Sequence, residues 1–206
     1  MKKLALVLAS ILAINKRNKF FKGGIGMLAK KIMSLDVESN GLWGNPISIG
    51  FTLEDNGNVL KKAEACYINE QVEKYDDWVM ENVINPLKEN KEVIHFNSYL
   101  ELLKWFATEY TKVKNEYTVL YHMGHIVESN LFKELRNNNL IGDWDAPYTP
   151  IEMSVLLGIN GFNPDSVDVL VKQGLIEKPA KSQTHQALYD AEVCGRAYWF
   201  LTKKNI

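Results

Sequence analysis

The sequence predicts an α/β fold with a mixed β-sheet, and three observations indicate it. The first third of the chain holds three consecutive strand patterns joined by turn signals. An isolated run of β-branched and aromatic residues lies near the middle, and stretches with the apolar spacing of helices flank it and close the chain. Consecutive strands followed by alternating helices and strand are typical of α/β domains that contain parallel and antiparallel pairs.

A meander of three strands is expected first. Residues 32–35 form a short apolar run that leads into Asp36, and residues 47–53 form a second run after a Gly-Asn-Pro sequence. The sequence Asp-Asn-Gly-Asn at residues 55–58 is a strong hairpin signal, because Asn-Gly readily adopts the positive φ angles of tight hairpin turns. Residues 59–68 are therefore expected to return as the third strand.

The rest of the chain is expected to be helical apart from one buried strand at residues 117–121. Ser98 is placed to cap one helix, because a serine oxygen can accept a hydrogen bond from the first amides of a helix. Apolar residues recur with helical spacing in residues 76–87, 98–110, 128–135, 151–157, 167–173 and 186–201.

The 206-residue chain is expected to be one domain at residues 33–206, preceded by an extension at residues 1–32. Eight of the 24 basic residues and no acidic residue lie in the extension, which leaves 16 basic and 25 acidic residues, a net charge of −9, in the domain. A domain this acidic will not hold long nucleic acid by a broad basic surface. Cys66 and Cys194 lack the spacing of a zinc site or a disulfide framework, so neither is expected.

The extension has two interpretations. Residues 1–14 begin with two lysines and continue as an apolar run, which resembles the front of a signal peptide. The run is shorter than the roughly 20 residues that cross a bilayer as a helix, and basic residues follow it without a clean cleavage site. A cytoplasmic location is therefore expected, with export as the alternative. We favour a mis-assigned start, at Met27 or Met33, because the Lys-Gly-Gly at residues 22–24 can be encoded by a purine run that acts as a ribosome-binding site.

Two acids stand two residues apart at the end of the first expected strand. Residues two apart in a strand point to the same face, so Asp36 and Glu38 would place two carboxylates side by side. Like charges this close are costly unless a cation lies between them, and hard cations such as Mg²⁺ prefer oxygen ligands. Taken alone, the pair has an alternative interpretation as two unrelated acids at a solvated strand end.

A histidine and an aspartate open the last expected helix, in the sequence His-Gln-Ala-Leu-Tyr-Asp at residues 185–190. His185 lies at or before the first turn, and Asp190 lies about one and a half turns further along. A histidine there can accept a proton from a water held by a metal that Asp190 ligates. Alone, His185 is more often a capping or surface residue, but the two motifs in this order indicate a shared metal site.

Together the two motifs resemble those of the DEDDh 3′→5′ exonucleases of the ribonuclease H-like fold. That family includes oligoribonuclease, ribonuclease T and the proofreading subunits of bacterial replicases. Asp-Val-Glu-Ser-Asn-Gly-Leu at residues 36–42 resembles the first exonuclease motif, and residues 185–190 resemble the third motif, HxAxxD. The resemblance covers roughly residues 33–202 and implies a three-layer α/β fold, with a mixed five-stranded sheet flanked by helices.

The resemblance also implies a fourth acid, from a second motif in the middle of the chain. In the family this is an aspartate at the start of a helix, followed by hydrophobic residues three and four positions later. Glu128 occupies this position, with Leu131 and Phe132 at the expected offsets, so glutamate replaces the usual aspartate. Asn130 is the alternative under a shifted alignment, and it would leave the site one carboxylate short.

By this resemblance the chain hydrolyses phosphodiester bonds at the 3′ end of single-stranded DNA or RNA, with two divalent cations, Mg²⁺ or Mn²⁺. The residues implied as metal ligands are Asp36, Glu38, Glu128 and Asp190. Asp36 would bridge the two ions, with Glu128 at the second ion. His185 would be the general base that takes a proton from the attacking water.

The turn after the first motif is implied to cradle the terminal nucleotide. Its residues are Ser39, Asn40, Gly41, Leu42 and Trp43. Backbone amides of the turn can meet the 3′ hydroxyl, and Leu42 or Trp43 can pack on the base, since stacking on an aromatic ring does not depend on base identity. Core packing is the alternative for Trp43.

Two alternative functions remain beside the exonuclease. The departure at Glu128 permits a catalytically impaired domain of the same fold that binds nucleic acid without cleaving it. Residues 1–14 alone suggest a structural or membrane-associated protein, although no stable membrane partner is expected. Dimers are common among the enzymes that the chain resembles, but no interface is readable in the sequence.

Overall fold

The computed structural model describes residues 29–180 and 185–203, so the interpretations of residues 1–28 lie outside the described residues. The strands form a six-stranded sheet in the order β4-β3-β2-β1-β5-β6. The β1–β2 and β2–β3 pairs are antiparallel, and the other three pairs are parallel. The mixed sheet predicted from the sequence is therefore confirmed. The strands are β1 (Lys31–Ser39), β2 (Pro46–Asp55), β3 (Asn58–Cys66), β4 (Ile94–His95), β5 (Thr118–Tyr121) and β6 (Ile151–Glu152).

The first three strands form the expected meander. A tight turn joins β2 to β3, in which Asn56 and Gly57 have φ angles of 50° and 86°, as the Asn-Gly signal predicts. Across the meander, Asp36 lies opposite Gly50, and Gly50 lies opposite Glu64. Directly opposed residues share a face of the sheet, so these three positions form one row across β1, β2 and β3.

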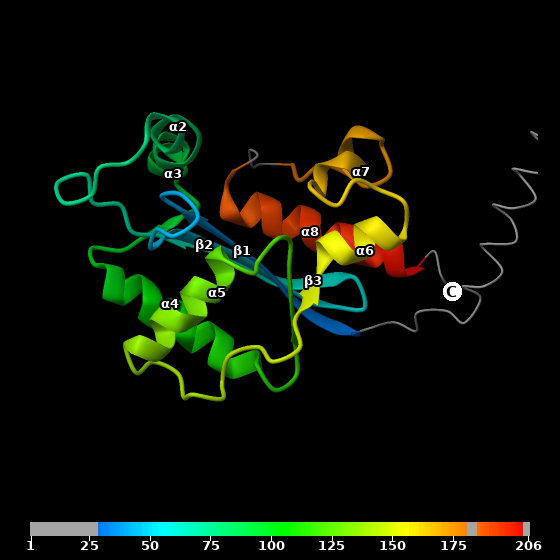
Figure 1. Cartoon of the computed structure of the whole chain (residues 1–206), viewed down its shortest axis with the longest axis horizontal. Coiled ribbons are helices and arrows are strands. Elements are labelled where there is room, and N and C mark those ends of the chain that lie inside the picture. The colour runs from blue at the N-terminus through cyan, green and yellow to red at the C-terminus, as the bar shows by residue number, and fades with distance from the viewer. Residues whose placement is uncertain (1–28, 181–184, 204–206) are drawn as a thin grey trace, which may run out of the picture.

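Helices cover both faces of the sheet and give the three expected layers (Figure 1). One face packs against α4 (Tyr99–Val113) and α5 (Val127–Asn137). The other face packs against α6 (Met153–Ile159), α7 (Asp168–Lys172) and α8 (Ala187–Lys203). Each of these two interfaces buries its own apolar cluster, and the sheet lies between them.

The cap predicted at the start of α4 is confirmed. Ser98 has an extended backbone and its Oγ accepts a hydrogen bond from the Glu101 N–H at 3.3 Å. The bond satisfies one of the first amides of the helix, which have no partner within the helix itself. The local sequence therefore sets where α4 begins.

The helix expected at residues 76–87 is broken into three pieces. It begins as α2 (Asp77–Val79), widens into the π-helical segment η1 (Met80–Ile84) and ends as α3 (Asn85–Glu89). Pro86 has no N–H to donate to the preceding turn, so one backbone hydrogen bond of a regular α-helix is missing at this point. A π-helical turn before the proline rearranges the hydrogen bonds, which the periodicity of apolar residues does not indicate.

The sheet has one strand more than the five that the resemblance implies. Strands β4 and β6 pair with their neighbours over two residues each, which is too short to leave a pattern in the sequence. The spacing of residues 151–157 predicts one helix. Instead Ile151 and Glu152 pair with the edge of β5, and α6 begins at Met153.

The packed domain includes residues before position 33. β1 starts at Lys31, Ile32 is fully buried, and the Tyr198 hydroxyl exchanges hydrogen bonds of 2.7 and 2.8 Å with the backbone of Ala29. Ala29 and Ile32, assigned from the sequence to the extension, pack with α8. Within residues 29–180 and 185–203, no helix is long and apolar enough to cross a membrane.

Candidate active site

The alternation of side chains along β1 separates its acids from its apolar residues. Leu35 and Val37 are buried against α4 and α5, so Asp36 and Glu38 point to the opposite face of the sheet. On that face, Ser34 donates from Oγ to a backbone carbonyl of α8 at 2.8 Å. The acid pair therefore lies on the face that α8 covers.

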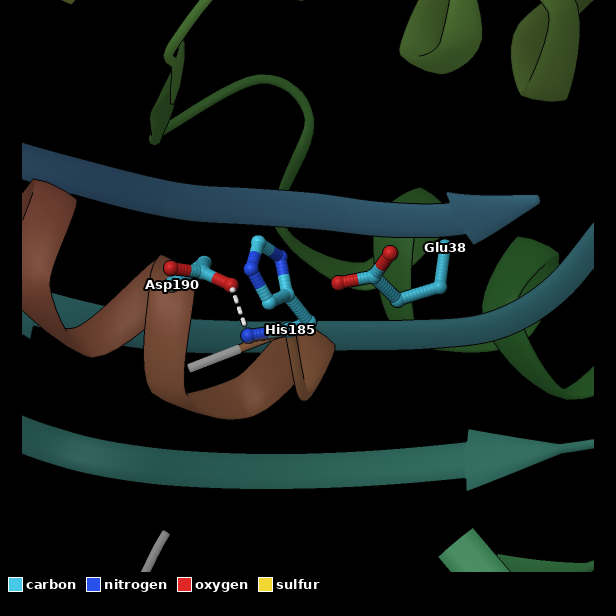
Figure 2. Close-up of side chains that lie close together, drawn as sticks. All are labelled: Glu38, His185 and Asp190. Atoms are coloured by element: carbon cyan, nitrogen blue, oxygen red, sulfur yellow. Dashed lines mark hydrogen bonds between the residues drawn. The ribbon is translucent and has the colours of Figure 1, made fainter. Parts of the chain in front are cut away.

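The third motif opens α8, and its two polar residues contact each other. His185 precedes the helix with a φ of 66°, and its backbone N–H donates to Oδ2 of Asp190 at 3.0 Å. Figure 2 shows the imidazole of His185 between the carboxylates of Asp190 and Glu38. Ligand atoms of these three residues all lie within 4.8 Å of one another, so the first and third motifs meet in one cluster.

Glu128 approaches the same end of β1 from the other layer. β5 pairs with β1 at Ile32–Ser34, and β1 extends past this pairing at its acidic end. There the buried Oε1 of Glu128 accepts a hydrogen bond from the Val37 N–H at 3.2 Å. Asn130 instead donates to the carbonyl of Gly44 at 3.2 Å. Of the two candidates for the second motif, Glu128 faces the strand of the acid pair, and its role as a metal ligand stays a prediction.

The cluster holds acids whose charged forms are unfavourable. Burial, followed by the charges of Asp190 and Glu38, raises the pKa of Asp36 well above its usual value. Burial, with Asp190 next, raises the pKa of Glu38 to about 8. Burial also raises the pKa values of Asp190 and Glu128 to about 7. The hydrogen bond from the His185 backbone lowers the pKa of Asp190, but its effect is smaller than that of burial. A cation among these carboxylates would stabilise their charged forms, and such a set of oxygen donors suits Mg²⁺ or Mn²⁺.

The turn after β1 presents two large apolar side chains to solvent. Gly41 has a φ of 75°, and Ser39 donates from Oγ to its carbonyl at 2.7 Å. The Asn40 side chain donates to a backbone carbonyl in the segment before α2 at 3.0 Å, which ties the turn to that segment. Leu42 and Trp43 are 60% and 81% exposed. Core packing of Trp43 is therefore wrong, and its ring is accessible to a ligand.

Two further residues join the site without any signal in the sequence. Trp78, whose helical spacing is that of a core residue, is half-exposed, and its ring meets the His185 ring nearly edge-on with centroids 4.9 Å apart. Glu64 on β3 is buried, and its charge contributes to the raised pKa of both Asp36 and Glu38. Neither residue lies in a local motif. Only strand pairing and the placement of α2 bring them to the cluster.

Comparisons with known proteins give no match in sequence and clear matches in structure. No known family model matches the chain, and no curated protein matches it. The nuclease domain of 3′hExo, a DEDDh family member bound to rAMP, matches with a TM-score of 0.60 and 10% identity, over 87% of this chain and 94% of that chain. A 3′-exonuclease in recognition of the histone mRNA stem-loop matches with a TM-score of 0.61 and 9% identity, over 97% of this chain and 74% of that chain.

Exonuclease I of E. coli in complex with a dA16 oligonucleotide also matches. The TM-score is 0.61 at 13% identity, and the match covers 85% of this chain but 41% of that chain. More than half of the exonuclease I chain therefore lies outside the match. The structural neighbours are thus 3′ exonucleases that include a DEDDh family member, and the chain has the ribonuclease H-like fold of these enzymes.

Proposed function

We propose that this chain is a metal-dependent 3′→5′ exonuclease that removes nucleotides from single-stranded nucleic acid. The observation that carries the proposal is the cluster of acids with His185 at the end of β1. The fold shared with 3′ exonucleases supports it. The substrate class is supported by neighbours that are bound to rAMP and to a dA16 oligonucleotide.

The donor set suits two divalent cations. Asp36, Glu38 and Asp190 would hold one ion, and Asp36 with Glu128 would hold the second. Bound Mg²⁺ or Mn²⁺ would lower the pKa of a coordinated water and stabilise the departing 3′ oxygen. The raised pKa values of these four acids fit the assignment, because burial disfavours their charged forms and a cation beside them would favour those forms.

His185 is the residue that we assign to proton transfer. Its side chain is exposed and lies next to the carboxylates of Glu38 and Asp190. A neutral imidazole in this position can accept a proton from water, because one of its ring nitrogens carries a free lone pair. The edge contact with Trp78 and the backbone bond to Asp190 hold the residue in place. Hydrolysis is therefore expected to need the neutral form of His185.

Exposed aromatic rings beside the cluster suit a terminal nucleotide. Trp43 lies in the turn that follows the acid pair, and Trp78 contacts His185. Stacking of a base on such a ring contributes about 1–3 kcal/mol whatever the base. Residues 33–206 carry a net charge of −9, so stacking and bound cations, and not a broad basic surface, would hold the strand. This favours action at a strand end.

Labelled oligonucleotides test the proposal directly. With Mg²⁺ or Mn²⁺, a 3′ label on single-stranded DNA or RNA should leave as a mononucleotide, and a 5′-labelled strand should shorten one nucleotide at a time. EDTA or the substitution Asp190→Ala should stop both reactions. Oligonucleotides that stay intact with the parent protein and metal, or cleavage that resists EDTA, would contradict the proposal.

The residue at the second motif favours a second candidate function, binding of nucleic acid ends without cleavage. Glutamate is one methylene longer than the aspartate that the resemblance implies. The Oε1 of Glu128 also already accepts a hydrogen bond from Val37. Fluorescence anisotropy with a labelled oligonucleotide and Mn²⁺ separates the two functions, since binding without any release of nucleotides would support the second.

A further inference from the structure

We propose that Glu64 anchors the start of α8 to β3 and so sets the position of His185 and Asp190. Glu64 would be a positioning residue, which acts on the cluster through α8 and not by contact with substrate. Its effect on catalysis rests on the proposed function, whereas the anchoring of the helix can be tested separately.

The carboxylate of Glu64 is buried where β3 passes the first turn of α8. Its side chain is 3% exposed, and Oε1 accepts a hydrogen bond from the Ser48 Oγ at 2.8 Å. The backbone N–H groups of Ala187 and Leu188 also lie close enough to the carboxylate to lower its pKa. The first amides of a helix have no partner within the helix, and an acid at this end is favoured by the helix dipole. A strand far earlier in the chain thus places an acid at the start of α8.

The first turn of α8 packs on a row of three residues of the sheet. Asp36, Gly50 and Glu64 lie opposite one another on the adjacent strands β1, β2 and β3. A Cβ atom at Gly50 would lie 2.2 Å from the Leu188 nitrogen and 2.3 Å from the Ala187 carbonyl carbon. Glycine is therefore needed for the helix backbone to rest on β2. The first turn of α8 lies over Gly50, with a carboxylate on the strand to each side.

A buried charge at Glu64 is unfavourable, so the hydrogen bonds that stabilise this charge support a role for the residue in positioning α8. Burial raises the pKa of Glu64, and the hydrogen bonds from Ser48 and the α8 amides lower it. Its charge also disfavours the charged forms of Asp36 and Glu38. A residue without charge would avoid this repulsion. An ionised carboxylate, however, can accept from the hydroxyl and both amides at once, which holds the helix start in one position.

Two substitutions separate an anchor from a metal ligand. Glu64→Ala removes the acceptor, whereas Glu64→Gln keeps one acceptor oxygen for the helix and removes the charge. Hydrogen exchange of the metal-free protein, measured on a peptide that covers residues 186–192, should rise at least about tenfold in Glu64→Ala and stay near the parental rate in Glu64→Gln. By calorimetry, Mn²⁺ affinity should fall about 10–100-fold in Glu64→Ala and less than about threefold in Glu64→Gln.

Glu54→Gln is the matched control. Glu54 is also a buried carboxylate between the sheet and α8, but it accepts a hydrogen bond from Trp199, farther along the helix. This substitution should lower stability without a change in Mn²⁺ affinity or in exchange at residues 186–192. Glu64→Asp, which keeps the charge and shortens the reach, should also raise the exchange, and it replaces Glu64→Ala if that variant does not fold.

Parental exchange rates in both Glu64→Ala and Glu64→Asp would overturn the inference. An equal loss of Mn²⁺ affinity in the Ala and Gln variants, with parental exchange, would also overturn it, because Glu64 would then be a metal ligand. The exchange measurement needs neither metal nor hydrolysis, so it decides the anchor even if the parent cleaves no oligonucleotide. A parent protein that binds no Mn²⁺ would contradict the proposed function alone.

Discussion

The two faces of the sheet are built from different kinds of side chain. The face toward α4 and α5 is apolar and packs against a cluster of aromatic rings. The ring centroid of Phe106 lies within 6.4 Å of the ring centroids of Phe51, Tyr110 and Phe132. The face toward α8 also buries apolar side chains of β1 and β5, but strands β1 to β3 add polar side chains to it that are equally buried. These are Ser34, Ser48, Thr52, Glu54 and Glu64.

This difference between the two faces gives them different roles in the stability of the fold and in the chemistry of the site. On the polar face, the Thr52 hydroxyl and the Trp199 ring N–H both donate to the Glu54 carboxylate at 2.6 Å. Such groups are tolerated when buried because they are hydrogen-bonded, but they contribute less than apolar burial. Both faces bury apolar clusters, but the purely apolar face contributes only to stability, whereas the polar face also holds acids at the end of β1. Four predictions test this division, from the largest expected effect to the smallest.

Truncation of a large side chain on the apolar face should lower the free energy of unfolding and leave the rate of hydrolysis unchanged. Phe106→Ala should lower the free energy of unfolding by about 3–5 kcal/mol, because it leaves a cavity among the packed rings. Urea denaturation measures this loss, and the cleavage rate per folded molecule should stay parental. Leu100→Ala is the control on the same helix, since Leu100 is 40% exposed. A rate that falls as in an active-site variant would contradict the division.

Removal of an acid from the polar face should slow hydrolysis without loss of stability. Asp36→Ala should slow hydrolysis by about 100–1000-fold, equivalent to about 3–4 kcal/mol of transition-state stabilisation. In EDTA its thermal stability should hold or rise, because one like charge leaves a crowded cluster. Asp165→Ala, in an exposed loop, should change neither rate nor stability. Cleavage at the parental rate by Asp36→Ala would refute the site.

Glu128 connects the two faces, because its helix packs on the apolar face while its carboxylate bonds to β1. Glu128→Gln should slow hydrolysis by about 10–100-fold, or about 1.4–2.7 kcal/mol, and a higher metal concentration should restore part of the rate. Glu128→Asp should retain part of the activity, and Asn130→Ala should matter much less. The opposite ranking would place the second motif two residues later, at Asn130.

The polar face should also make the metal-free protein sensitive to pH. Burial in the folded state raises the pKa of Glu38 to about 8, and the pKa values of Asp190 and Glu128 to about 7, whereas unfolded chains have values near about 4. Folding thus favours the protonated acids. The resulting stability is complete below about pH 4 and is lost as the pH rises through about 7–8.

Thermal melts in EDTA measure this effect. The Tm should fall between about pH 5 and 9, by about 2–4 °C for each kcal/mol lost. Asp36→Ala should flatten the curve, because it removes one acid whose pKa the fold raises, and excess Mg²⁺ should flatten it, because a bound cation favours the charged forms. A Tm of the metal-free parent that rises over this range would show that these acids are not strained by the fold.

Local patterns are sufficient to predict the main elements and the first and third motifs. The alternation through Leu35, Asp36 and Val37 places the acids opposite the apolar residues, because strand geometry repeats every two residues. The Asn-Gly turn and the Ser98 cap are equally local. The π-helical turn before Pro86 and the two-residue strands could not be predicted, since each depends on partners outside its own segment.

The sequence by itself determined which residues carry the acid pair and which open the last helix, since each pattern acts over a few neighbours. Only the tertiary structure decided that Glu64 lies at the start of α8, that Trp78 touches His185, and that Glu128 reaches β1. These contacts join segments far apart in the chain. They depend on strand register and on how closely a helix can approach the sheet over a glycine, and no local periodicity encodes either.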